Sequence, residues 1–358
     1  VEIGAATRVA EIALALLLFH DAARLDIRHL RKELQLPSRL LLVGLPLCML
    51  FGTVAGVLLF PEMALASVVL LAIMLSPTDA ALGQKVITDT AVPARVRQAL
   101  DVESGLNDGL AVPFFLVALE IANAELETGI TWAVLSSMAA QIGWGVICGV
   151  VVGLLGGILY HEADTRGWIS QEWRQVIPLA IALLVYAAAI ALGGSGFIAA
   201  FVGGIAFGTV SRAGETAVTE LTEATGDLFA AVTWILFGAL TVPVILPLID
   251  WRIMVYAVLS LTLVRMIPVM IAFAGQLVRR PTTVFIGWFG PRGLASLVFA
   301  LLAVEHGIPD GTIVLPTVLL TVALSVLLHG LTSVPLVAAY SRWFSLHPTD
   351  RSTATSRD

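Results

Sequence analysis

Charge is scarce in this chain. Of its 358 residues 13% are charged and 58% are hydrophobic, whereas a soluble globular domain carries roughly 25% charged residues. Only two cysteines are present, Cys48 and Cys148, and the six histidines are scattered, so no set of residues has metal-site spacing. These shortages argue against a soluble protein, a metalloenzyme and a nucleic-acid partner. They predict a protein that lies in a lipid bilayer and needs no cofactor.

Long hydrophobic runs fill most of the chain instead. A membrane-spanning helix needs about 20 apolar residues, so we predict an all-α polytopic membrane protein with about 11 segments. They lie at residues 3–20, 39–60, 64–83, 99–122, 132–158, 174–192, 195–210, 226–249, 252–276, 282–304 and 312–340. The seventh is rich in glycine, which predicts close helix contact. We expect a cytoplasmic helical linker at 21–39 and a disordered tail after Tyr340.

Basic residues orient these segments. The odd-numbered loops and the C-terminal tail hold 16 of the 20 Lys and Arg residues, and the even-numbered loops hold only Arg252. Short cytoplasmic loops are enriched in Lys and Arg. The sequence therefore predicts a cytoplasmic C-terminus, residue 1 on the outer face of the cell membrane, and an odd number of spans.

The fourth segment carries a polar run, Glu103-Ser104-Gly105-Leu106-Asn107-Asp108-Gly109. Ionisable residues at membrane depth are costly and mark functional sites. In a helix, Ser104 and Asp108 share a face, and Pro113 removes the hydrogen-bond donor of the Gly109 carbonyl. These oxygen atoms suit a small cation, so the run indicates a path for cations or protons. The alternative is that Asn-Asp-Gly forms a turn at a helix end.

Two other segments are interrupted near their middles. The runs are Ser76-Pro77-Thr78-Asp79 in the third segment and Gly290-Pro291-Arg292-Gly293 in the tenth. In a membrane, such breaks are tolerated only beside protein or water. Asp79 would neutralise a half-helix N-terminus and Arg292 a C-terminus. Each break lies in the middle of a triplet of segments, which predicts a transporter site between inverted repeats. For the third segment, an ordinary capped helix is the alternative.

One arginine, Arg265, lies in the middle of the ninth segment. A buried arginine needs a carboxylate partner, and we expect Glu103, which leaves Asp108 for ion exchange. The alternative is that Arg265 extends to a membrane interface.

The runs SPTDAALG and VESGLNDG, followed by LVRMIPV and GWFGPRGLASL, resemble the cation:proton antiporter 1 family. The likeness extends over the whole chain and is closest to the prokaryotic NhaP-type sodium/proton antiporters. It implies an inverted-repeat antiporter fold with two interrupted, crossing helices, a homodimer, and further helices upstream of Val1. By this resemblance, residues 39–122 and 250–340 form the transport core and 1–38 and 123–249 the dimer side, with 341–358 as a cytoplasmic tail.

The resemblance also assigns roles to single residues. Asp108 is implied to bind the ion and the proton, with Asn107 as its neutral partner and Ser104 and Thr78 as further ligands of Na⁺. Asp79 and Arg292 match the charges at the helix crossing, and Glu103 with Arg265 matches a stabilising ion pair. An acidic residue of the first segment reaches the ion in some members, and Asp21 is the nearest candidate.

We therefore expect a secondary antiporter that exchanges Na⁺, or else Li⁺ or K⁺, for H⁺ at Asp108 by alternating access. Because Asn107 is uncharged, exchange is expected to be electroneutral. One rival is an intramembrane aspartyl protease that uses Asp79 and Asp108, but the Gly-x-Gly-Asp run of such enzymes is absent. A second rival is a transport-inactive sensor or a channel of the same fold.

Overall fold

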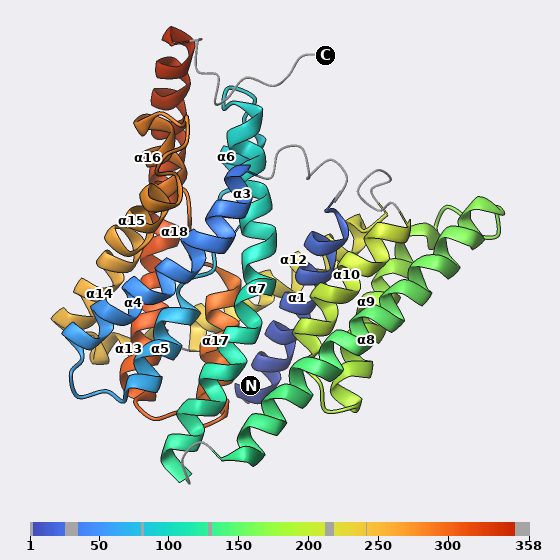
Figure 1. Cartoon of the computed structure of the whole chain (residues 1–358), viewed down its shortest axis with the longest axis horizontal. Coiled ribbons are helices and arrows are strands. Elements are labelled where there is room, and N and C mark those ends of the chain that lie inside the picture. The colour runs from blue at the N-terminus through green and yellow to red at the C-terminus, as the bar shows by residue number, and fades with distance from the viewer. Residues whose placement is uncertain are drawn as a thin grey trace. The chain divides into compact units, whose positions relative to one another are not determined.

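The computed structural model describes residues 3–25, 35–79, 82–127, 131–211, 218–240 and 242–347 (Figure 1). Within these ranges the secondary structure is helical, and helix occupies every one of the eleven expected segments. Residues 26–34 of the expected linker and 348–358 of the tail lie outside the described residues. The chain divides into two compact units, which we describe separately.

Unit 1 comprises Val1–Lys32 and Val112–Pro243. Its helices pack closely through glycine: a Cβ atom on Gly153 would lie 2.5 Å from the Gly203 carbonyl oxygen, and one on Gly208 would meet the backbone of Ala23. The close contact expected of the Gly-rich segment is therefore present. Its elements are α1 (Ile3–Ala23), the second half of α7 (Ala94–Glu127), α8 (Trp132–Thr165), α9 (Trp173–Ala191), α10 (Gly196–Ser211) and α12 (Glu220–Leu240).

Unit 2 comprises Glu33–Ala111 and Val244–Asp358 and contains both interrupted segments. The first interrupted segment comprises α5 (Leu65–Met74), the non-helical residues 75–79 and α6 (Gln84–Thr88). The second is α16 (Arg280–Trp288), an irregular stretch at 289–293, and α17 (Leu294–Glu305). The other elements are α3 (Gln35–Arg39), a π-helical turn (Leu40–Gly44), α4 (Leu45–Leu59), the first half of α7, α14 (Trp251–Leu261), α15 (Leu263–Ala272) and α18 (Gly311–Leu346). At the unit boundary lie α13 (Val242–Ile245) and a 3₁₀ turn (Leu246–Leu248).

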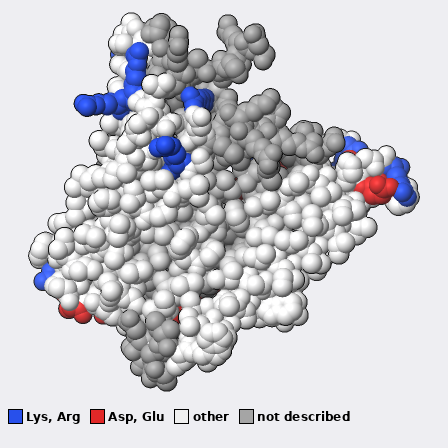
Figure 2. Space-filling view, viewed as in Figure 1, with Lys and Arg blue, Asp and Glu red and all other residues white. Residues whose placement is uncertain are grey.

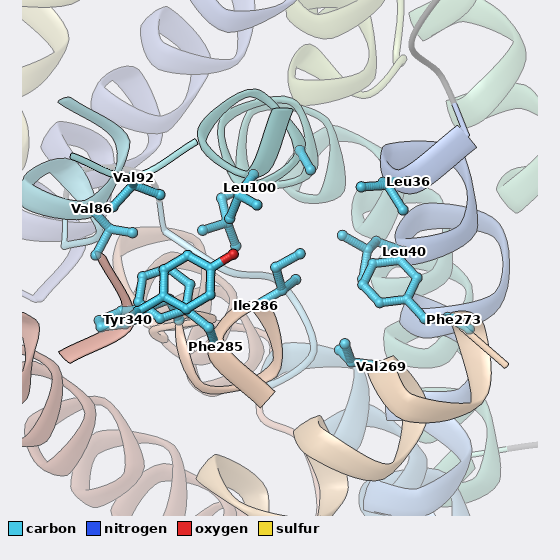
Figure 3. Packing of buried hydrophobic residues seen from close by; sticks show 14 of the residues in the cluster. Leu36, Leu40, Val86, Val92, Leu100, Val269, Phe273, Phe285, Ile286 and Tyr340 are labelled. Atoms are coloured by element: carbon cyan, nitrogen blue, oxygen red, sulfur yellow. The ribbon is translucent and has the colours of Figure 1, made fainter. Parts of the chain in front are cut away.

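A buried apolar cluster anchors one end of unit 2 (Figure 3). Val86 of α6 and Leu100 of α7 join Phe285 of α16 and Tyr340 of α18 in this cluster. The Phe285 and Tyr340 rings stack with centroids 4.2 Å apart, and the Thr282 and Tyr340 hydroxyls are hydrogen-bonded at 3.0 Å. The same packing thus holds the α6 end of the first interrupted segment and the α16 end of the second.

Several element boundaries differ from those expected from the sequence. The chain is not disordered directly after Tyr340, because Trp343 and Phe344 pack against the Tyr340 ring and extend α18 to Leu346. α8 continues beyond residue 158 to Thr165, in polar turns that no apolar pattern marks. The ninth segment is broken at Thr262 between α14 and α15, where the Thr262 hydroxyl donates to the Val258 carbonyl at 2.6 Å.

The described helices have the dimensions of a membrane protein. Six of them are long and apolar enough to cross a bilayer, and three shorter apolar helices, α5, α10 and α17, accompany them. On the face seen in Figure 2, the charged side chains lie toward helix ends, and the surface between them carries no visible charge. The chain is therefore an all-α, multi-pass membrane protein.

Candidate ion-binding site

The two interrupted segments of unit 2 meet at their irregular stretches. The Asp79 backbone N–H donates to the Pro291 carbonyl at 2.8 Å. Irregular backbone at membrane depth must find partners within the protein. Each interruption therefore supplies a partner to the other, and the two segments cross at this point.

The Asp79 carboxylate lies at the N-terminus of α17. Its Oδ2 accepts a hydrogen bond at 2.9 Å from the N–H of Leu294, the first residue of that helix, and its Oδ1 accepts one at 3.2 Å from Leu82. A Cβ atom on Gly293 would overlap the Asp79 side chain, so only glycine allows this approach. A negative charge stabilises a helix N-terminus. Asp79 thus caps a helix of the opposite interrupted segment.

Arg292 makes the reciprocal contact. Its guanidinium is fully buried, and its Nη1 donates to the Ser76 and Pro77 carbonyls at 2.7 and 3.1 Å. These carbonyls follow the C-terminal end of α5, where a positive charge is stabilising. The backbone N–H of Arg292 donates to Ser325 Oγ at 2.7 Å. The two charges expected at the crossing therefore each neutralise a helix end of the other segment.

Glu103 and Arg265 form a bidentate ion pair. Arg265 Nη1 donates to Glu103 Oε1 at 2.5 Å and Nη2 to Oε2 at 2.8 Å, and each side chain is 2% exposed. This burial contradicts the alternative in which Arg265 extends to an interface. A bidentate geometry is the one that offsets the cost of burying both charges. The pair joins α7 to α15.

Thr78, Ser104 and Asn107 form a buried polar cluster where the first interruption meets α7. Asn107 Nδ2 donates to Thr78 Oγ1 at 2.6 Å, and Thr78 Oγ1 lies 3.2 Å from Ser104 Oγ. Among the described residues, Asn107 Oδ1 has no hydrogen-bond partner. A buried acceptor without a partner costs about 1–3 kcal/mol, so this oxygen suits a bound cation or water.

Asp108 is half-buried on α7, one residue beyond Asn107 and one helical turn beyond Ser104. Helix α7 continues unbroken through this run, which contradicts the alternative of a turn at Asn-Asp-Gly. Pro113 lies inside the same helix, where it removes the donor of the Gly109 carbonyl. Asp21 lies in the last turn of α1, in unit 1, and its role stays a prediction.

The sequence profile of the family described as "sodium/hydrogen exchanger, transmembrane" matches residues 6–339. The chain belongs to the sodium/hydrogen exchanger family. Among similar relatives is a Na⁺/H⁺ antiporter of Schizosaccharomyces pombe, 25% identical over 93% of this exchanger and 80% of the relative.

Bacterial relatives of the exchanger are longer. The K⁺/H⁺ antiporter NhaP2 of Shewanella sp. (strain ANA-3) is 24% identical over 90% of this chain and 55% of the relative. The K⁺/H⁺ antiporter NhaP of Alkalimonas amylolytica is 25% identical over 94% and 57%. The exchanger thus spans little more than half the length of these two proteins.

The fold of the exchanger is similar to that of a solved antiporter. The sodium proton antiporter MjNhaP1 from Methanocaldococcus jannaschii at pH 8 superposes with a TM-score of 0.74 and 18% identity, covering 95% of this chain and 88% of that one. At this identity the likeness establishes the fold alone. It is the inverted-repeat antiporter fold with two interrupted, crossing helices that the sequence predicts.

The roles of several residues around the crossing were not predicted from the sequence. Gly290 packs against the Arg265 guanidinium and Gly293 against Asp79. Both belong to the predicted break Gly290-Pro291-Arg292-Gly293, so their position within it was an available signal. Ser325 and His329 lie in α18 and contact the second interruption. Their only sequence signal is the spacing of four residues in an apolar helix.

Proposed function

We propose that this exchanger is a secondary active antiporter that exchanges a monovalent cation for H⁺ at Asp108. Membership of the sodium/hydrogen exchanger family supports the reaction type. The observation that carries the site is the buried oxygen cluster of Thr78, Ser104 and Asn107, in which Ser104 and Asn107 lie on α7 within one helical turn of Asp108. We expect Na⁺ as the substrate cation, with Li⁺ and K⁺ as the alternatives to be tested.

The chemistry of the donor set supports a small cation. Hydroxyl, amide and carboxylate oxygens are hard ligands, which suit hard cations. Asn107 Oδ1 is buried and has no described partner, so binding an ion would relieve the cost of leaving it unpaired. A single carboxylate in a poorly hydrated site does not favourably hold a proton and a cation together, and this competition couples the two fluxes.

Asn107 sets the proposed stoichiometry. Its amide donates to Thr78 and carries no charge in either state. One exchangeable carboxylate then carries one proton or one monovalent cation, so exchange is electroneutral. The reciprocal capping by Asp79 and Arg292 keeps the helix ends neutralised while access alternates between the two sides of the membrane.

The membrane arrangement belongs to the same proposal. The distribution of Lys and Arg over the loops supports a cytoplasmic C-terminus in the cell membrane. The family resemblance supports a working homodimer.

The direct test is exchange by the purified protein in liposomes, read as a pH change driven by Na⁺, Li⁺ or K⁺ gradients. Asp108→Asn should abolish exchange, whereas Asp89→Asn, at a half-buried aspartate that follows α6 outside the site, should leave it unchanged. Exchange that persists in Asp108→Asn would refute the site. A transport current that reverses with membrane potential would contradict electroneutral exchange.

The rival functions are separated by the same preparation. A protease dyad needs Asp79 available for catalysis, but its two oxygens accept hydrogen bonds from the Leu82 and Leu294 amides, so this rival is not favoured. A channel would conduct without coupling the cation to H⁺, and a transport-inactive sensor would give no cation-driven pH change.

A further inference from the structure

His329 has acceptors at both ring nitrogens. The side chain is 2% exposed on α18, with Nδ1 2.8 Å from the Ser325 carbonyl oxygen and Nε2 2.8 Å from the Trp288 carbonyl oxygen. Ser325 Oγ lies 3.2 Å from the same Nδ1. That hydroxyl oxygen also accepts the backbone N–H of Arg292 at the helix crossing.

A neutral imidazole carries one N–H and satisfies only part of this arrangement. In the neutral form, Nε2–H donates to the Trp288 carbonyl and the Ser325 hydroxyl donates to Nδ1. Because Nδ1 then carries no hydrogen, it cannot donate to the Ser325 carbonyl oxygen that it also faces. In the protonated form, both ring N–H groups donate to the two carbonyls. The Ser325 hydroxyl hydrogen is then released from the ring. The two protonation states therefore differ in where the Ser325 hydroxyl points.

The position of His329 also suits a cation. Trp288 is the last residue of α16, so its carbonyl is among those without a helical partner, and a positive charge stabilises such an end. The Trp288 oxygen accepts one further hydrogen bond, from the Gly290 N–H at 2.9 Å. Two acceptors and a helix C-terminus thus converge on one ring.

Other groups oppose the charge. The charged residues acting on His329 from the neighbouring elements are Arg292 in the second interruption and Arg265 on α15. Burial disfavours an imidazolium as well. From the second interrupted segment, the aromatic side chains of Trp288 and Phe289 also contact the ring, at centroid distances of 5.4 and 6.4 Å. Some of these groups therefore favour the charged imidazolium and others favour the neutral ring. Histidine ordinarily titrates between about pH 5 and 8.

We propose that His329 is a second proton-binding site of this protein, separate from Asp108, and that its proton state sets the orientation of the Ser325 hydroxyl. Ser325 holds the Arg292 backbone, and the Arg292 side chain holds the carbonyls that follow α5. A proton at His329 therefore alters the hydrogen bonding of the crossing. The proton binding stands without the proposed transport function; only its effect on exchange rests on that function.

The binding is tested by nuclear magnetic resonance of the purified protein labelled with ¹³C in its histidine rings. His329→Gln identifies the His329 signal, and His306→Gln provides a matched control. Nδ1 of His306 contacts the carbonyl four residues earlier, as in His329, but among the described residues its Nε2 has no partner. When the His329 signal is followed over the range in which histidines ordinarily change charge, between about pH 5 and 8, we expect one reversible change of protonation.

Ser325→Ala makes the test specific. Losing the hydroxyl that donates to the neutral ring should raise the His329 midpoint by about 0.5–1 pH unit, the equivalent of one hydrogen bond. The His306 signal should not move. A His329 signal that keeps one protonation state over this pH range, or a midpoint unchanged in Ser325→Ala, would overturn the proposal. If His329→Gln does not fold, tryptophan fluorescence of the wild-type protein gives a second readout. A pH-dependent change in emission that is absent in Trp288→Phe reports the same charge beside the indole.

The effect on exchange is measured in liposomes. His329→Gln should move or flatten the pH profile of cation-driven exchange, and His306→Gln should not. An unchanged profile in His329→Gln would refute the coupling to exchange while leaving the resonance titration to decide proton binding. An inactive wild-type protein would refute the proposed function instead.

Discussion

The two units of this exchanger hold their helices together by different means. In unit 1, α8 and α10 run without interruption, and glycines bring their backbones into contact. In unit 2 the helices are broken, and buried charges and hydroxyls join the pieces. The first arrangement depends on shape and the second on charge. The candidate ion site lies in unit 2, where buried charges and hydroxyls join the broken helices, because a broken helix exposes polar backbone to an ion.

Removing the buried ion pair should have the largest effect on stability. Glu103→Ala leaves Arg265 uncompensated in the interior, which we expect to cost about 3–5 kcal/mol. Glu62→Ala is the matched control in the same unit, because its pair with Arg252 is exposed at a similar distance of 2.8 Å and should contribute about 0–1 kcal/mol. Denaturant unfolding in detergent measures both. Equal losses would show that burial does not distinguish the two pairs.

This pair was predictable because charge is so scarce. A chain with Arg265 in one apolar segment and Glu103 in another offers few alternative partners. The segments themselves were equally accessible, because a bilayer requires long apolar helices. The breaks at Pro77 and Pro291 followed from the missing N–H groups.

The exchange of partners at the crossing was not predictable from local sequence. Asp79 caps Leu294, which is 215 residues away, and only the folded chain brings these residues together. The extension of α18 depends on aromatic packing around Tyr340 rather than on apolar periodicity. No local pattern in the sequence marks His329, because its second acceptor comes from α16.

Filling the glycine contact of unit 1 should have the next largest effect. A Cβ on Gly153 would meet the Gly203 backbone at 2.5 and 2.8 Å, so Gly153→Ala must move α8 away from α10. We expect this overpacking to lower the free energy of unfolding by about 1–3 kcal/mol. Gly143→Ala is the control on the same helix, since nothing lies within 4 Å of its Cβ position, and it should be neutral or slightly stabilising. Thermal unfolding in detergent compares the two. An equal loss in both variants would show that the close contact with α10 is not what makes Gly153→Ala destabilising.

Neutralising the cap at the crossing should cost less. Asp79→Asn keeps an acceptor for Leu294 but removes the charge at the α17 N-terminus, which contributes up to about 2 kcal/mol in a partly buried setting. Asp250→Asn is the control: Asp250 is an exposed N-cap of α14 that accepts from Ile253 at 2.9 Å. Its loss should be at the lower end of the range, near 0.3 kcal/mol, because water screens the charge. A larger loss for Asp250→Asn would contradict a special role for the crossing.

The smallest effect is expected at Asp89, where the same kind of contact lies outside the membrane-spanning segments. Hydrogen bonds from the Ala91 N–H and from Lys85 hold the pKa of the Asp89 carboxyl below its usual range. A depressed pKa means that the carboxylate stabilises this turn above its ordinary pKa of about 3.9, and that the contribution is lost as pH falls through the folded value. Asp89→Asn should therefore reduce hydrogen-exchange protection of Ala91 at neutral pH and have no effect in strong acid. Lys85→Ala should show the same pH dependence with a smaller change, since the Ala91 hydrogen bond remains. A pH-independent loss in Asp89→Asn would show that shape, as in unit 1, and not charge holds this turn.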